Sequence, residues 1–345
     1  MPPGEGFRMY SQAAAEGIAS VPAAPAAFHE LFSEVERVPV WADFPRMERG
    51  GRLFLRYGAL AGVVLGARSL VLGYVSPAGN KPLVFSGRLA EQAPRRLAET
   101  SRFVQAVVLP GGVRPFGEGY QITLKVRLMH AQVRAMIERS GRWDEQAWGR
   151  PINQHDMAGT VLLFSAALLG GLRILGASIP HDQSEAYMHL WRWTGRLMGV
   201  TDDVLPTSEA DALSLGELIA ATQAPPDEDA RALTRALLET PLLDARSDAQ
   251  RFLAPQRVAL GKAFARELLG EPLAGQLGIS PSRYRHAMPV IRTMTRVRDA
   301  LHRAAPARAD RAVEDGARYW RYVVRRGLGQ EGTDFSPPES LRRAR

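Results

Sequence analysis

The sequence of 345 residues contains no cysteine. Thiolates hold iron–sulfur clusters, P450-type haem iron, covalent c-type haem and most structural zinc, so these classes of site are excluded, together with disulfides and a cysteine nucleophile. A bound metal ion must therefore use histidine or carboxylate ligands. The histidines that are available are His29, His130, His155, His181, His189, His286 and His302.

A large excess of one charge is also lacking, since 44 Lys and Arg stand against 36 Asp and Glu, a net charge of +8. The basic residues are interleaved with acidic ones. No GxSxG, GxxxxGK[ST] or HExxH motif occurs, so hydrolase and NTPase functions have no support. A basic helical nucleic-acid-binding module remains an alternative because Ser280–His286 is a basic and aromatic run, but we expect no nucleic-acid partner.

Long uninterrupted apolar runs are lacking as well. Of the two most apolar segments, Leu53–Val75 is interrupted by Arg56 and Arg68, and Met157–Leu172 is shorter than the roughly 20 residues that cross a bilayer. We expect both to be buried helices and expect no transmembrane segment. The N-terminal stretch MPPGEGFRMYSQAAAEGIAS has no charged region followed by an apolar run, which predicts no export signal and a cytoplasmic location.

Strand signals are few, and helical periodicity dominates the chain. The β-rich runs Leu70–Val75 and Val107–Leu109 are short and do not recur at regular spacing. Apolar residues recur at spacings of three and four, which predicts an all-α fold. We expect one helical domain over residues 26–327, between a loosely ordered N-terminal tail (1–25) and a C-terminal tail (328–345). The helical segments are Ala27–Val35, Gly58–Leu72, Pro94–Val107, Tyr120–Ile137, Asp156–Leu175, Ser184–Met198, Glu209–Thr222, Asp227–Leu238, Ala249–Leu269, Met288–Leu301 and Arg308–Val324.

The predicted helix Tyr120–Ile137 contains the most informative histidine. His130 lies beside an apolar seam, so its imidazole is expected at a wall of the core. On the same helix, Arg127 and Arg134 fall three residues before and four residues after His130, which places all three on one stripe. The seam consists of Val126, Met129, Val133 and Ile137.

This stripe provides an apolar wall, a nitrogen ligand and two cations. A flat metal-containing dianion needs all three, and haem b is such a ligand. The commoner meaning of the same spacing is a half-buried histidine with a backbone partner and a solvated face of arginines. The spacing alone therefore leaves both interpretations of His130, Arg127 and Arg134 open.

A second group of metal-ligand residue types is formed by His181, Glu185 and His189. On a helix the two histidines lie roughly 12 Å apart along the axis, too far for one ion to bind both. A mononuclear site is therefore excluded, and we expect capping and helix-surface roles. His155 and Asp156 stand near a predicted helix start, where polar residues are most often caps.

Four strings in the chain together resemble the latex clearing proteins, or rubber oxygenases, and the wider MpaB-type oxygenase family. Their order and spacing are similar to those of the family from about Leu89 to Pro206, and more loosely to about Arg325. The strings are Arg96–Thr100, Val126–Arg134, Pro151–Thr160 and Glu185–Arg192.

The resemblance implies an all-helical fold with a globin-like core that holds non-covalent haem b, and an O2-dependent cleavage of an isoprenoid carbon–carbon double bond. His130 is similar to the proximal iron ligand of the family. Arg127 and Arg134 match arginines beside the haem. Arg96 and Thr100 match an arginine and a threonine that serve haem retention and pocket shape.

Departures from the family concern the acid–base group and the export signal. Rubber oxygenases carry a carboxylate in the loop before the arginine matched by Arg96, whereas this chain has Gly79–Lys81 there. Glu99 occupies a position that is lysine in the rubber enzymes. It is either a substitute acid–base group or an exposed helix residue, and we favour the exposed role. The expected lack of an export signal argues against secreted polyisoprene degradation.

We therefore expect a haem b-dependent oxygenase that uses O2 to cleave or oxidise a C=C bond of a small hydrophobic, isoprenoid-like substrate. The alternative is a non-catalytic haem-binding sensor or carrier, in which His130 and the arginines bind haem but no distal pocket admits an alkene. Product formation in the presence of O2 separates the two.

Overall fold

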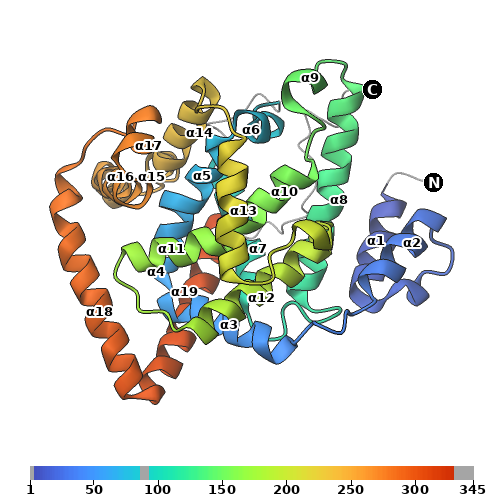
Figure 1. Cartoon of the computed structure of the whole chain (residues 1–345), viewed down its shortest axis with the longest axis horizontal. Coiled ribbons are helices and arrows are strands. Elements are labelled where there is room, and N and C mark those ends of the chain that lie inside the picture. Colours follow the sequence, from blue (N-terminus) through green and yellow to red (C-terminus); the bar gives the residue numbers. More distant parts are fainter. Residues whose placement is uncertain (1–3, 86–92, 330–345) are drawn as a thin grey trace.

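The computed structural model describes residues 4–85 and 93–329, and every regular element in them is helical (Figure 1). The predicted all-α class is thereby confirmed. From residue 330 onward, the predicted C-terminal tail lies outside the described residues. The helices are α1 (Glu5–Glu16), α2 (Ala26–Val35), α3 (Phe44–Tyr57), α4 (Ala59–Val64), α5 (Leu70–Val75), α6 (Pro77–Val84), α7 (Ala93–Val108), α8 (Glu118–Arg139), α9 (Glu145–Trp148), α10 (Gln154–Phe164), α11 (Ala166–Ile174), α12 (His181–Met198), α13 (Glu209–Ala221), α14 (Glu228–Leu238), α15 (Thr240–Leu243), α16 (Asp248–Leu269), α17 (Glu271–Gln276), α18 (Met288–Ala304) and α19 (Pro306–Leu328), with short 3-10 turns η1 (Ile18–Ser20), η3 (Asp202–Val204) and η4 (Arg283–Ala287) and a π-helical turn η2 (Leu65–Ser69).

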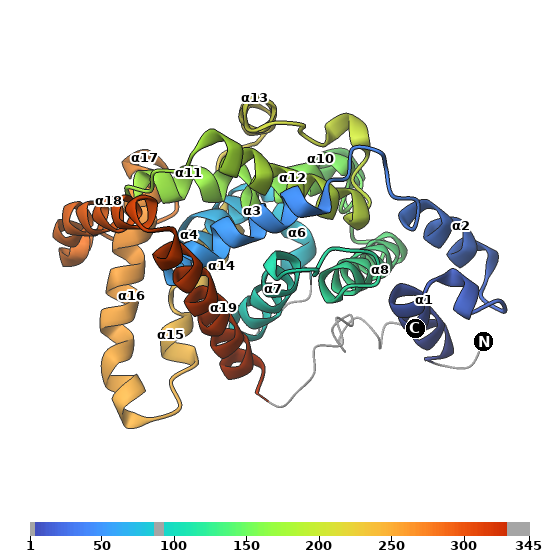
Figure 2. The same ribbon diagram turned by 90° about the horizontal axis from the view of Figure 1, so that it is seen from below.

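Helices α3 and α12 run side by side through the middle of the molecule, with α7 and α8 on one side and α13 on the other (Figure 2). Glycines allow the closest approaches. A Cβ at Gly50 would lie 2.4 Å from the carbonyl oxygen of Ala186 in α12, and a Cβ at Gly51 would lie 2.2 Å from that of Val108 in α7. The backbones of α3, α7 and α12 therefore meet without intervening side chains.

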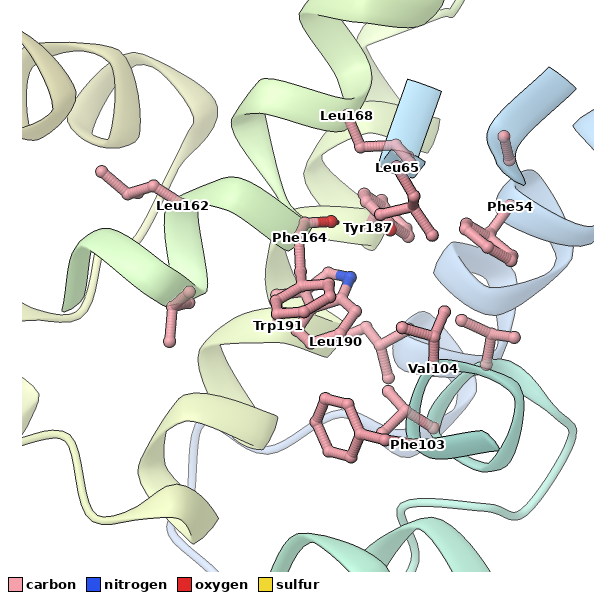
Figure 3. Close-up of a cluster of buried hydrophobic side chains, with 14 of the residues drawn as sticks. Phe54, Leu65, Phe103, Val104, Leu162, Phe164, Leu168, Tyr187, Leu190 and Trp191 are labelled. Carbon is pink, nitrogen blue, oxygen red and sulfur yellow. Dashed lines mark hydrogen bonds between the residues drawn. The ribbon is translucent and has the colours of Figure 1, made fainter. Parts of the chain in front are cut away.

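An aromatic cluster fills the space between these helices (Figure 3). The rings of Phe164 and Trp191 are stacked, with centroids 4.9 Å apart, and Phe103 lies edge-on to both. The buried hydroxyl of Tyr187 donates a hydrogen bond to the Phe164 carbonyl oxygen. The cluster joins α7, α10 and α12 in one core, because the buried rings remove a large apolar area from water.

The apolar segment that contains α10 and α11 is broken at Ser165, where one continuous helix was predicted. Ser165 departs from helical geometry, and its hydroxyl donates to the Val161 carbonyl oxygen. In the described chain, Gln154–Ile174 is the one segment long and apolar enough to span a membrane unaided, and 61% of its most apolar window is buried. A second such segment, α3 together with the helix Ala59–Val75, qualifies only if its 88° bend is disregarded.

The N-terminal residues differ from the expected loosely ordered tail. Helix α1 lies against α8 and buries Tyr10, Ala13 and Ala14 completely. The Tyr10 hydroxyl donates a hydrogen bond of 2.8 Å to the Leu124 carbonyl oxygen. These tertiary contacts hold the short alanine-rich segment in place. The pattern of apolar residues within the segment did not predict them.

Candidate functional site

Helix α8 places His130 at a wall of the core, where its side chain is partly buried. The helix begins after Gly117, has Glu118 in its first turn and ends with Arg139, so both terminal charges complement the helix dipole. Its N-terminal half is largely buried, with Ile122, Thr123 and Leu124 inside the core. His130 follows two turns later, on a helix that α7 and α12 hold from the side.

The imidazole of His130 is neutral, and one of its ring nitrogens lacks a partner among the described residues. Burial, helped by the nearby Arg134 charge, lowers the pKa of His130 from 6.5 to about 4. Nδ1 is fully buried, and it has no hydrogen-bond partner among the described residues. An unpaired buried polar atom is costly, so Nδ1 favours a partner that residues 4–85 and 93–329 do not supply. A neutral imidazole is the form of histidine that binds metals.

Arg134 holds the loop that leads into α10. Its guanidinium donates to the carbonyl oxygens of Pro151 (3.0 Å) and Ile152 (2.5 Å). Ile152 has a φ of 54°, which is strained for a β-branched residue. Arg134 therefore stabilises an unfavourable turn directly before Asn153, whose side chain caps α10.

Arg127 binds the C-terminal end of α12. Its Nη1 lies 3.5 Å from the Leu197 carbonyl oxygen and 3.7 Å from the Glu34 carboxylate. Gly199, at a φ of +93°, leaves room for this contact, because a Cβ there would lie 2.8 Å from Nε of Arg127. Each of the two stripe arginines thus binds main-chain carbonyls of another segment, which the sequence did not predict.

The three α7 residues singled out in the sequence lie in the first two turns of that helix. Arg96 and Thr100 are partly buried. The Arg96 charge acts on Tyr74 of α5. Burial raises the pKa of Tyr74, and the positive charge of Arg96 offsets part of this rise. Glu99 instead pairs with Arg95 one turn earlier, with 3.0 Å between Oε1 and Nε.

Tyr74 was missed in the sequence analysis. It falls in the β-rich run Leu70–Val75, which is helical in the structure. No sequence signal indicated that α5 and α7 bring Tyr74 and Arg96 together.

The segment Gly79–Lys81, which has no carboxylate, is part of α6. Asn80 is completely buried and donates to the Tyr74 carbonyl oxygen, while its Oδ1 has no partner among the described residues. Lys81 forms ion pairs with Asp227 and Asp229 at the start of α14. The segment therefore places the Asn80 side-chain amide in the interior, and the Lys81 charge links α6 to α14.

The other histidine group has structural partners. His189 is buried, and its Nε2 accepts a hydrogen bond from the backbone N–H of Asp43, 3.1 Å away. Glu185 accepts from the backbone N–H of Glu209. His155 contacts Thr222 and Asp156. Among the described residues, no set of three metal-ligand side chains gathers at one point.

The fold and this site define an all-α protein in which α8 carries a neutral, partly buried histidine whose Nδ1 has no partner in the described part of the chain. The family model "ER-bound oxygenase mpaB/B'/Rubber oxygenase, catalytic domain" matches residues 53–300, and the chain belongs to this family. The expected resemblance is confirmed.

A curated relative and a solved structure are also similar to this chain. Rubber oxygenase from Streptomyces sp. (strain K30) is 25% identical over 186 residues, which are 53% of this chain and 46% of that protein. The chain thus spans about half the length of the curated relative that it matches. A structure of latex clearing protein LCP in the closed state shares the fold, with a TM-score of 0.69, 21% identity and coverage of 90% of this chain and 84% of that one.

Proposed function

We propose that the protein is a haem b-dependent oxygenase that uses O2 to cleave or oxidise a C=C bond of a small hydrophobic, isoprenoid-like substrate. The observation that carries the proposal is the neutral, partly buried His130, whose fully buried Nδ1 has no partner among the described residues. Membership of an oxygenase catalytic-domain family supports the reaction class. The substrate rests on the resemblance to rubber oxygenases and is the least supported part.

The residues around His130 fit a haem. His130 would hold the iron. Arg127 and Arg134 would bind the haem propionates through the guanidinium N–H groups that are not used in their contacts with the protein. Arg96 and Thr100 would contact the haem from α7. The bound haem supplies the activation of O2, which side chains alone do not perform.

The contribution of the chain is to position groups and exclude water. Burial keeps His130 in its neutral form, so one ring nitrogen keeps a lone pair available at neutral pH. The apolar residues of α8 and α7 exclude water from the same region, which strengthens every polar contact there. Glu99 is an acid–base group only if it leaves Arg95, so we expect Glu99→Gln to retain most of the activity.

The experiment that tests the proposal is the absorption spectrum of the purified protein together with a pyridine haemochrome assay, for wild type, His130→Ala and His286→Ala. We expect near-stoichiometric haem b in wild type, its loss or a shifted Soret band in His130→Ala, and no change in His286→Ala. His286 is a suitable control because it is exposed on η4. A colourless wild type after reconstitution with hemin would overturn the haem assignment.

Catalysis is tested separately, with terpenoid alkenes and O2 supplied to the haem-loaded protein. Cleavage of a C=C bond by one O2 gives two carbonyl compounds, so an aldehyde and a ketone are expected. Haem binding without any product would instead favour the alternative of a non-catalytic sensor or carrier.

A further inference from the structure

Helix α18 exposes a continuous apolar stripe. Four large side chains at spacings of four, three and four residues lie on one face of the helix. Large exposed apolar patches mark interaction sites, whereas single exposed side chains do not. The stripe consists of Val290 (58% exposed), Met294 (67%), Val297 (54%) and Leu301 (46%).

The surroundings of this stripe are basic. Arg296 and Arg303 are exposed along one edge of the helix, and Arg283 and Arg285 are exposed just before its start. From position 280 to position 309 the only carboxylate is Asp299, which is buried. The exposed face therefore combines apolar side chains with positive charge and has no negative charge of its own.

The opposite face fixes α18 to the body of the protein. The buried Asp299 carboxylate accepts hydrogen bonds of 2.8 Å from the Tyr57 hydroxyl and from the Ser178 backbone N–H. Arg292 donates to the Ile174 carbonyl oxygen. In Figure 1 the helix lies along the outer edge of the molecule, so the stripe points away from the core on a rigid support.

We propose that this face of α18 docks on a lipid bilayer that contains anionic lipids. An interfacial helix lies in the membrane plane with its apolar side chains inserted about 5–10 Å and with arginines at the headgroups. Over 17 residues, α18 is long enough to lie flat on the surface for about 25 Å.

Charge decides between the possible occupants. In a symmetric pair of α18 helices, the arginines of one copy would meet those of the other, with no exposed carboxylate of either helix to balance them. Nucleic acid would match the arginines but leave the apolar stripe in water. An anionic bilayer satisfies both features. The proposal does not depend on haem or on the oxygenase activity.

The first test is co-sedimentation with vesicles of phosphatidylcholine alone, or of phosphatidylcholine and phosphatidylserine in equal parts. We expect binding to the anionic vesicles that weakens with added salt. Replacing all four stripe residues with serine should weaken binding by about tenfold or more. Arg296→Gln combined with Arg303→Gln should weaken it by roughly tenfold.

The matched control is Leu213→Ser combined with Leu218→Ser. These leucines of α13 are 56% and 66% exposed, but exposed Asp211 and Glu217 lie beside them. We expect this control to bind anionic vesicles as wild type does. All replaced side chains are at the surface, so we expect each variant to fold. Circular dichroism of each variant checks this.

The second test uses the fact that the sequence has no cysteine, so one introduced cysteine can be labelled selectively with a nitroxide. A nitroxide on Met294→Cys should become inaccessible to a water-soluble relaxation agent when anionic vesicles are added, and one on Leu213→Cys should remain accessible. No vesicle binding, or binding that the serine variant retains, would overturn the proposal. A dimer that the serine variant abolishes, or binding of DNA in place of vesicles, would overturn it as well.

Discussion

His130 and His189 are both kept neutral by the interior, and this makes the protein sensitive to acid. Burial is the main cause in each case, and it lowers both pKa values from 6.5 to about 4. As the pH falls, the unfolded chain therefore takes up protons before the folded one. The stabilisation is complete above about pH 6.5 and is lost as the pH falls towards 4.

We expect the free energy of unfolding of the haem-free protein to fall by about 2 kcal/mol per histidine between about pH 7 and pH 4.5. Urea denaturation at both pH values measures it. His189→Gln keeps an acceptor for the Asp43 N–H but cannot be protonated, so it should lose less stability on acidification. An equal loss in variant and wild type would contradict the role assigned to His189.

Arg134 has a structural function in addition to its proposed contact with haem. Arg134→Ala removes charge-assisted hydrogen bonds to two carbonyls of a strained turn, and we expect a loss of about 2–3 kcal/mol in unfolding free energy. Chemical denaturation of the haem-free protein measures this. Arg139→Ala is the control, because within the described residues Arg139 binds a carbonyl of its own helix and no other segment.

Haem retention then tests the propionate assignment of Arg134 and Arg127 separately. Alanine at either position should speed the transfer of haem to an acceptor such as apomyoglobin. Unchanged haem affinity in both variants would show that these arginines serve only the carbonyls of Pro151, Ile152 and Leu197.

At the scale of elements, α3 depends on glycine where it crosses other helices. In Gly51→Ala the new methyl group meets the Val108 backbone, which cannot move aside as a flexible side chain does. Overpacking of this kind costs about 1–3 kcal/mol, so we expect a lower melting temperature. Gly275→Ala is the control, because nothing lies within 4 Å of a Cβ there. Equal melting temperatures of the two variants would contradict this account.

The elements with clear apolar periodicity could be predicted from the sequence. The segment Tyr120–Ile137 became α8, and Gly199 ends α12 in a left-handed conformation as a stop signal should. Helix α3 was missed although its apolar and charged residues lie on different faces. Its adjacent glycines, Gly50 and Gly51, are poor helix formers, and the close contacts with α7 and α12 that they serve are visible only in the structure.

The site was predictable only as far as it lies on one helix. His130 and its neighbours follow from spacing along α8. The partners of Arg127 and Arg134 are carbonyls of residues far along the chain, and no side-chain pattern indicates a carbonyl. Tyr74 was missed for a related reason. It lies in the segment Leu53–Val75, which was expected to be a buried helix, but no spacing along that segment indicates Arg96 of another helix.

At the scale of the whole molecule, α19, the last described helix, packs against α3 near the start of the chain and completes the core. Trp320 of α19 is buried against Phe54 of α3, with ring centroids 5.1 Å apart, and Gly316 lies against the Leu55 backbone. Helix α19 also packs on α7, which carries Arg96 and Thr100. The candidate site is therefore supported by segments from both ends of the chain.

This closure predicts that the helical domain, with the proposed haem bound, unfolds as one unit. Trp320→Ala should lower the free energy of unfolding by about 3–5 kcal/mol. Because α19 supports α7, helix content and the Soret band should be lost at the same urea concentration, in the variant as in wild type. Simultaneous far-ultraviolet circular dichroism and Soret absorbance measure both. If the variant lost its α19 packing in a separate early step while the Soret band stayed intact, the chain would contain two independent units, and α19 would not support the site.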